Sequence, residues 1–313
     1  MRRILLSTVL AAVLLAGSAL AAPGDRAVED VRVLSADDMQ GRLAGSPGGA
    51  KARAYVEGRM KAIGLTVVEQ PFSFSKEGVD VTGVNLIARI EGARKDGPVM
   101  VVTAHYDHLG VRNGEIYNGA DDNASGVAAL LAVAEAFKAK PPKHTVYIVA
   151  LDGEEMGLRG ARAFVESPPV PLDRVALNVN FDMLAKNARG ELYAAGGSAN
   201  PWVKARLDAV AAIAPVTLKQ GHDTGPDDSF DNWTYQSDHG VFAKAGVAWV
   251  YFGVEDHPEY HKPTDDFDTV PLPFFRNAVT TAVHATWLFD RDLDTLPKRS
   301  GSPAVSDGCV WPG

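Results

Sequence analysis

Short apolar runs alternate along the chain with longer stretches in which apolar residues recur every three or four positions. The apolar runs are typical of buried strands, and we expect strands at Val84–Ile90, Val99–Ala104, Val146–Leu151, Val175–Phe181, Leu192–Ala195 and Val247–Phe252. The helical spacing predicts a helix that begins after Ser46-Pro47 and ends before Gly64, and helices near Ala124–Ala139, Pro201–Ile213 and Phe274–Phe289. Strands that alternate with helices indicate an α/β fold: a single three-layer domain with a mostly parallel, mixed central sheet flanked by helices.

The pattern shows no linker or internal repeat between about Val28 and Asp292. A chain of 313 residues that is 46% hydrophobic can bury one large core. We therefore expect one catalytic domain over residues 28–292 and a loosely ordered tail over residues 293–313. The tail contains the single cysteine, Cys309, so no disulfide can form within the chain.

The first 21 residues have the pattern of a secretory signal peptide. Arg2 and Arg3 precede an apolar run from Ile4 to Leu15, and Ala19-Leu20-Ala21 supplies a small-residue cleavage site. The apolar run is shorter than the ~20 residues that a membrane span needs. We expect an exported protein, periplasmic or secreted, with no membrane attachment after cleavage.

The net charge argues against one class of partner. It is -8 at pH 7, and removal of Arg2 and Arg3 would make it more negative. The chain also lacks a basic tract. Nucleic acids and anionic membrane surfaces are therefore not expected partners.

Residues able to bind metals or transfer protons follow four of the predicted strands. They are His105-Tyr106-Asp107-His108, Asp152-Gly153-Glu154-Glu155, Asp182, and, after a short loop, His257 and His261. A further acidic pair, Asp121-Asp122, precedes a predicted helix. Ligands of open α/β sheets bind beyond the carboxyl ends of the strands, so we expect these groups to converge on a divalent metal centre, with a pair of ions. The adjacent glutamates can then divide the work, one binding metal and the other moving a proton.

These motifs occur in a fixed order that resembles metallopeptidase family 28, the zinc aminopeptidases with two co-catalytic metals. The resemblance runs from about Leu34 to Phe289 and begins with Asp38-Met-Gln-Gly-Arg-Leu-Ala-Gly-Ser46. The motifs are His105-x-Asp107, Gly119-Ala-Asp-Asp-Asn-Ala-Ser-Gly126, Asp152-Gly-Glu-Glu155, Asp182-Met183, Ser237-Asp238-His239 and Tyr260-His261-x-Pro263-x-Asp265. The resemblance implies a fold of the zinc-aminopeptidase/phosphorylase type and two divalent ions, with zinc expected.

Carried over by position, the resemblance implies a role for each residue. His105 and Asp182 would hold one metal, Glu155 and His261 the other, and Asp122 would bridge them, with a cis peptide between Asp122 and Asn123. Glu154 would be the general base. Asp107 would accept the second ring N–H of His105, and Tyr260 would stabilise the oxyanion.

Several neighbouring residues compete for these roles. Asp121 competes with Asp122 as the bridging ligand, and His257 competes with His261. We expect His108 to point to solvent or the rim of the cleft. We expect His239 to support the wall of the site, and Asp238 to accept nearby backbone hydrogen bonds. One aspartate of the loop His222–Asp231 is a candidate for binding the substrate ammonium group.

The expected function is that of an exported, monomeric aminopeptidase acting on peptide substrates. A glutaminyl cyclase, which would use a single zinc and an intramolecular attack, is an alternative with the same fold. Metallopeptidase family 20 has a similar order of ligands, but the interval between Asp182 and His261 is too short for its dimerisation domain. A non-catalytic peptidase-like binding protein is the alternative from another class.

Overall fold

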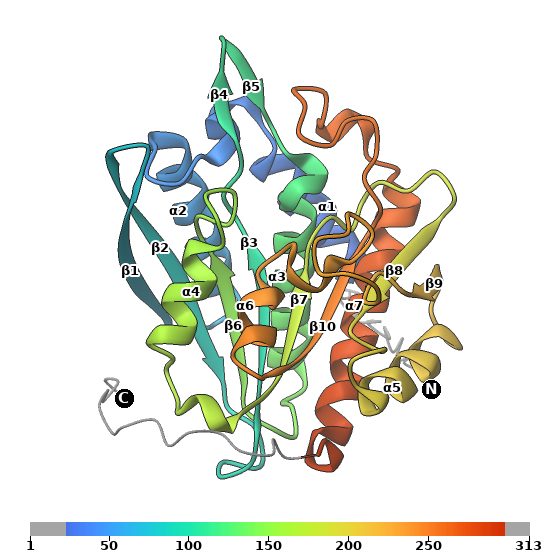
Figure 1. The fold of residues 1–313 in the computed structure, drawn as a ribbon. Helices are drawn as coiled ribbons and strands as arrows, with labels where there is room; N and C mark the ends of the chain where they lie inside the picture. The colour runs from blue at the N-terminus through green and yellow to red at the C-terminus, as the bar shows by residue number, and fades with distance from the viewer. Residues whose placement is uncertain (1–22, 298–313) are drawn as a thin grey trace, which may run out of the picture.

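The computed structural model describes residues 23–297, in which one large mixed sheet forms the centre of the fold (Figure 1). The predicted signal peptide, Cys309 and most of the predicted tail lie outside these residues. The sheet contains β1 (Val67–Lys76), β2 (Val79–Ile90), β3 (Val99–His105), β6 (Val146–Leu151), β7 (Val175–Phe181), β8 (Glu191–Ala195), β9 (Thr217–Gln220) and β10 (Ala248–Gly253). A separate hairpin is formed by β4 (Gly110–Arg112) and β5 (Glu115–Tyr117).

The strand order in the sheet is β1-β2-β6-β3-β7-β10-β8-β9. The four central strands β6, β3, β7 and β10 are parallel, whereas β2 and β8 join them antiparallel. Every residue of β3 and β6 is buried, because helices cover both faces of this part of the sheet. The predicted mostly parallel, mixed sheet is confirmed, and its parallel centre places four carboxyl ends at one edge.

Helices cover the two faces unequally (Figure 1). One face carries α1 (Pro23–Leu34), α2 (Pro47–Ala62), α3 (Gly126–Ala139), α5 (Pro201–Ala211) and α7 (Leu272–Asp292). The other face carries α4 (Arg159–Glu166) and α6 (His239–Lys244). Side chains alternate between the two cores: Leu86 lies in the larger core and Ile87 in the smaller. The fold is therefore the predicted three-layer α/β domain.

Short and marginal elements were not predicted. The edge strand β1 alternates half-buried and exposed residues, and the edge strand β9 has 4 residues, so neither has a continuous apolar run. The first half of β2 extends beyond the predicted Val84 and pairs only with β1. The 8-residue α4 and 6-residue α6 are shorter than the stretches over which a helical period is recognised.

The packed fold extends past both predicted domain boundaries. At the start, α1 begins at Pro23 and buries Ala27, Val31 and Leu34. At the end, Leu293 is buried, and the Asp294 carboxylate lies 2.9 Å from Nε2 of His144. Leu293 and Asp294, which were assigned to the predicted tail, therefore pack against the domain. No helix within residues 23–297 is both long and apolar enough to cross a membrane.

Candidate metal centre

Most of the predicted metal-binding and proton-transferring residues meet at the carboxyl edge of the sheet. They lie around a cavity of about 340 Å³ lined by His105, Asp122, Glu154, Glu155, Asp182, Tyr260 and His261 together with Gly157, Leu158, Met183, Trp233, Tyr235, Gln236, Ser237, Tyr251, Val254 and Asp256. Residues from strand ends, from the turn before α3 and from the loop after β10 thus share one space.

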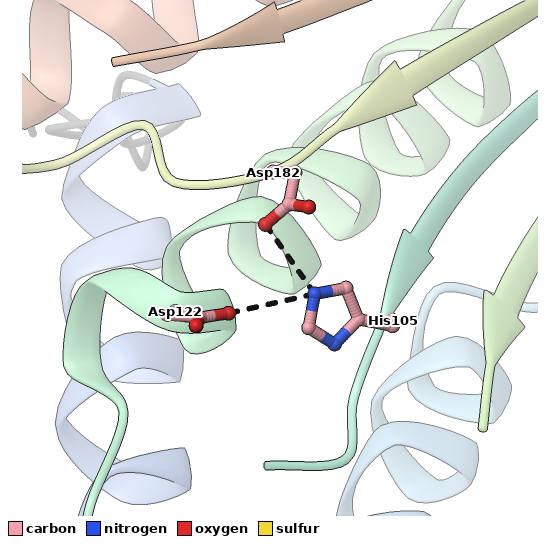
Figure 2. Close-up of side chains that lie close together, drawn as sticks. All are labelled: His105, Asp122 and Asp182. Atoms are coloured by element: carbon pink, nitrogen blue, oxygen red, sulfur yellow. Dashed lines mark hydrogen bonds and ion pairs between the residues drawn. The ribbon is translucent and has the colours of Figure 1, made fainter. Parts of the chain in front are cut away.

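The first cluster consists of His105, Asp122 and Asp182 (Figure 2). His105 is the last residue of β3, and Asp182 directly follows the neighbouring strand β7. Nε2 of His105 lies 3.3 Å from Oδ1 of Asp182 and 3.5 Å from Oδ1 of Asp122. The peptide bond from Asp122 to Asn123 is cis, as expected.

A chain of buried hydrogen bonds fixes Asp182. The Ser237 hydroxyl donates to Oδ2 of Asp182 over 2.7 Å and accepts from the Asn180 amide over 3.0 Å. Asn180 in turn accepts a hydrogen bond from the Thr103 hydroxyl over 2.6 Å. The second carboxylate oxygen is therefore occupied, which leaves Oδ1 facing His105.

The second cluster consists of Asp122, Glu155, His261 and His108. Nε2 of His261 lies 3.1 Å from Oδ2 of Asp122 and 3.5 Å from Oε2 of Glu155. Asp122 thus presents Oδ1 to the first cluster and Oδ2 to the second, which is the geometry of a bridging carboxylate.

The position of His108 corrects the sequence interpretation. It was expected to face solvent or the cleft rim, but its side chain is fully buried. Its Nδ1 lies 2.7 Å from Oε1 of Glu155 and 3.7 Å from Oδ2 of Asp122. The segment after β3 turns inward at this point, and only its spacing from His105 could have suggested a contact with the cluster.

The two competing pairs of residues are separated in space. The Asp121 carboxylate accepts backbone N–H bonds from Ala185 over 2.6 Å and Lys186 over 2.9 Å, and lies 3.1 Å from Nε2 of His257. Asp121 and His257 therefore pair with each other and brace the segment after Asp182. Asp122 and His261 face Glu155 instead, which agrees with the roles implied by the family resemblance.

Glu154 follows a left-handed turn at Gly153, where φ is +69°. Its backbone N–H donates to Oδ1 of Asp107 over 3.1 Å, which fixes the turn. Asp107 was expected to accept the ring N–H of His105, but its carboxylate lies 3.7 Å from Nδ1, and the nearer acceptor is its own backbone carbonyl at 3.2 Å. The Asp107 side chain therefore positions Glu154, while its main chain orients His105.

Tyr260 lines the cavity and stacks on His261, with ring centroids 3.9 Å apart. Burial raises the pKa of Tyr260, and the nearby Asp122 raises it further, so the hydroxyl keeps its proton and can donate. Asp256 also lines the cavity.

The loop His222–Asp231, described throughout, contributes none of its aspartates to the cavity lining. Asp223 accepts from the backbone of Gly196 and Ser198, and Asp231 lies 2.8 Å from Nδ1 of His222. The structure therefore does not bring these candidates to the site.

Two buried charged residues that received no role in the sequence analysis hold the ligand segments. The fully buried Arg42 donates to the backbone carbonyls of Tyr106 over 2.9 Å and Gly119 over 2.9 Å. Asp265 accepts the backbone N–H groups of Asp121 and Asp122, each over 3.1 Å. Both residues belong to motifs of the family resemblance, but the motifs do not show that these side chains form hydrogen bonds with the backbone.

Asp238 also differs from expectation. It is fully buried, and neither carboxylate oxygen has a hydrogen-bond partner among the described residues. Burial raises the pKa of Asp238 to about 8. The adjacent His239 does support the cavity wall, since its Nε2 lies 2.8 Å from the carbonyl of Trp233.

The charges around the cavity favour cations. Asp122, Asp182, Glu154 and Glu155 face this one space. Burial, and then Glu155, raise the pKa of Asp122, and burial raises the pKa of Glu154 well above its usual value. Burial alone would lower the pKa of His261, but Asp122 and Glu155 raise it to about 10. Bound divalent ions would compensate this negative charge.

The donor atoms also fit metal ions. Two ligands of one tetrahedral zinc, each ~2.1 Å from it, lie about 3.4 Å apart. The separations of 3.3 and 3.5 Å in the first cluster and 3.1 and 3.5 Å around His261 are close to this value. Oε1 of Glu155 is buried with no hydrogen-bond partner among the described residues. The residues therefore suit two divalent ions that share Asp122.

A family model described as peptidase family M28 matches residues 85–286, which span β2 to α7 and include every ligand of both clusters. The chain belongs to peptidase family M28. The family uses zinc, which agrees with the two clusters.

Individual M28 relatives are distant. Aminopeptidase YwaD of Bacillus subtilis is 27% identical over 226 residues, which cover 67% of this chain but 46% of YwaD. Among solved structures, the zinc aminopeptidase BSAP of Bacillus subtilis matches with a TM-score of 0.71 at 17% identity, over 84% of this chain and 94% of BSAP. A glutaminyl cyclase of Porphyromonas gingivalis matches with a TM-score of 0.70 at 18% identity, over 84% of this chain and 97% of that one. These structural matches confirm the zinc-aminopeptidase-like fold.

Proposed function

We propose that this M28 peptidase is an exported zinc aminopeptidase that removes N-terminal residues from peptides. The main support is that Glu154 lines the same cavity as two metal-binding clusters that share Asp122. A group that moves protons and the ligands of two ions therefore surround one reaction space. The names of YwaD and BSAP support the assignment to aminopeptidases.

The chain's own residues would divide the hydrolysis between them. Zinc ions, when bound, lower the pKa of water towards ~7 and polarise the scissile carbonyl. Glu154 takes a proton from the attacking water and delivers it to the leaving amine as the C–N bond breaks. Asp107 keeps Glu154 in place through its backbone N–H. The Tyr260 hydroxyl donates a hydrogen bond to the oxyanion that develops on the carbonyl.

A glutaminyl cyclase is the second candidate, because one shares the fold. A cyclase that uses a single zinc requires one ligand cluster. This chain has two clusters with a shared carboxylate, which favours the peptidase.

Peptides with an N-terminal glutamine separate these functions. An aminopeptidase would release free glutamine and shorten the peptide by one residue, whereas a cyclase would release ammonia and leave a peptide of unchanged length that begins with pyroglutamate. We expect mass spectrometry to show free glutamine from the open peptide, no product from an N-acetylated copy, and no product after chelation. Cleavage of the acetylated copy, or a pyroglutamyl product, would contradict the proposal. An inactive protein would also contradict it and would support the non-catalytic peptidase-like binding protein.

Glu154→Gln tests the proposed base. Glutamine keeps the shape of the side chain but cannot accept the proton, so we expect kcat to fall about 10²–10⁴-fold while zinc content stays unchanged. Glu166→Gln on the exposed end of α4 is the matched control and should keep full activity. A Glu154→Gln enzyme with near-normal kcat would show that another group moves the proton.

Export is proposed from the pattern of residues 1–21 alone. Sequencing of the N-terminus of protein recovered outside the cytoplasm should show that the mature chain begins after Ala21. A chain that retains Arg2 and Arg3 would contradict export by this signal.

A further inference from the structure

His108 is a buried histidine for which neither the motifs nor the family register provide a role. Its side chain is fully buried, and neither ring nitrogen has a hydrogen-bond partner among the described residues. A buried polar group without a partner destabilises the folded protein. Within the described residues 23–297, the ring instead lies against two carboxylates of the second cluster, those of Glu155 and Asp122.

Ligand atoms of the second cluster lie close to the ring. Nδ1 lies 2.7 Å from Oε1 of Glu155 and 3.7 Å from Oδ2 of Asp122. Despite the short separation, Nδ1 and Oε1 do not have the orientation of a hydrogen bond. His108, Asp122 and Glu155 each offer one ligand atom, and these atoms all lie within 4.8 Å of one another, so they can hold a common metal ion. His261 approaches the same two carboxylates from another side, through Oε2 of Glu155 and Oδ2 of Asp122.

The surroundings of His108 hold its ring in this orientation. A Cβ atom on Gly119 would lie 2.5 Å from Cδ2 of His108, so the absence of a side chain at Gly119 makes room for the ring. The His108 backbone N–H donates to the carbonyl of Arg42 over 3.4 Å. The ring of His261 packs beside it, with centroids 5.9 Å apart. The imidazole is therefore placed by its neighbours and cannot turn away freely.

We propose that His108 is a protein ligand of the second cluster, which then offers four protein donors to one divalent ion: Asp122, Glu155, His261 and Nδ1 of His108. The first cluster offers three: His105, Asp182 and Asp122. A closed set of four protein ligands is typical of structural zinc sites, whereas three ligands leave a position open for water or substrate. The second ion should therefore be held more tightly, and the open position belongs to the first.

This inference rests on the two-ion site of the proposed function, but its tests do not measure peptide hydrolysis. A protein that binds two ions as described and cleaves no peptide would contradict the proposed function alone. A peptidase in which His108 does not contact an ion would contradict this inference alone.

The first test uses the wild-type protein, loaded with an NMR-active cadmium isotope and carrying isotope-labelled histidine nitrogens. We expect one cadmium to couple to a single imidazole, that of His105, and the other to two imidazoles, those of His108 and His261. One coupled nitrogen on each cadmium would overturn the proposal.

The second test measures zinc retained after dialysis against a weak chelator. Wild-type protein should retain one zinc per chain. His108→Asn should bind this zinc at least tenfold more weakly and lose it on dialysis, because asparagine can donate a hydrogen bond to Glu155 but is a poor zinc ligand. His284→Asn, which removes an exposed imidazole from α7, is the matched control and should match the wild type. A folded His108→Asn protein that retains zinc like the wild type would show that His108 acts only through Glu155.

Discussion

The two clusters share Asp122 but are built from different parts of the fold. In the first cluster, His105 ends β3 and Asp182 follows the adjacent parallel strand β7, and both are buried. In the second, His261 comes from the loop after β10 and its side chain is 40% exposed. The sheet therefore fixes the first cluster, while a loop completes the second at the edge of the cavity. The first cluster thus has two ligands on rigid strands, whereas one ligand of the second depends on the conformation of a loop.

The supports of the clusters also differ. Asp182 is held by the side chain of Ser237, within a chain that continues to Asn180 and Thr103 in the sheet. The segments that carry His108 and Asp122 are held through their main chain by Arg42. Substitutions at Ser237 and at Arg42 can therefore remove the two supports separately and test whether the two clusters are held independently.

Asp122→Asn should have the largest effect, because it weakens both clusters at once. We expect loss of both ions and a fall in kcat of about 10³-fold or more, which corresponds to about 4 kcal/mol. Metal analysis and peptide assays on the same preparation measure the two effects.

Asp121→Asn is the control that matches this change, since Asp121 is adjacent but binds the backbone of Ala185 and Lys186. It should cost stability yet keep two ions per chain. If Asp121→Asn lost both ions and Asp122→Asn kept them, the assignment of the bridging residue would be reversed.

The first cluster was predictable from the pattern of the sequence. Continuous apolar runs identify β3 and β7 as buried strands, so the residues that follow them, His105 and Asp182, had to lie at the same edge of a parallel sheet. The same reasoning located Glu154 and Glu155 after β6. Adjacent strands bring these residues together regardless of the conformation of the loops.

The second cluster required information that the pattern does not contain. The choice of Asp122 over Asp121, and of His261 over His257, came from the resemblance to the family. The hydrophobic pattern does not specify the side-chain directions of neighbouring residues in a turn or loop. The burial of His108 depends on the space left at Gly119, which is a long-range packing effect. The roles of Arg42 and Asp265 are hydrogen bonds to main chain, and these depend on loop conformations that a single sequence does not specify.

Arg42→Lys should weaken the support of the second cluster and of Asp122. Burial lowers the pKa of Arg42 to about 10, and its planar group serves several carbonyls at once, which include Leu34 and Asn118. The single ammonium group of lysine cannot replace the several N–H donors of the guanidinium group. We therefore expect a loss of about 3 kcal/mol in the free energy of unfolding, measured with urea.

Arg89→Lys at an exposed position of β2 is the control, because its partner Glu91 is also exposed, and it should change stability by less than about 0.5 kcal/mol. Equal stabilities of the Arg42→Lys and Arg89→Lys proteins would mean that the buried guanidinium group of Arg42 does not hold the segments that carry His108 and Asp122.

Ser237→Ala should have the smallest of these effects and should act on the first cluster alone. The change leaves Oδ2 of Asp182 and the Asn180 amide without their partner, so Asp182 loses its fixed orientation. Loss of such a supporting hydrogen bond typically weakens metal binding about 10–100-fold. Stepwise zinc titration should therefore show one weakened site and one unchanged site. Ser35→Ala removes another buried hydroxyl, which bonds to Val31 in α1, and should leave both affinities unchanged. If Ser237→Ala weakened zinc binding at both sites equally, the two clusters would share their supporting contacts. The ligands on the sheet and the ligand on the loop would then not be held independently.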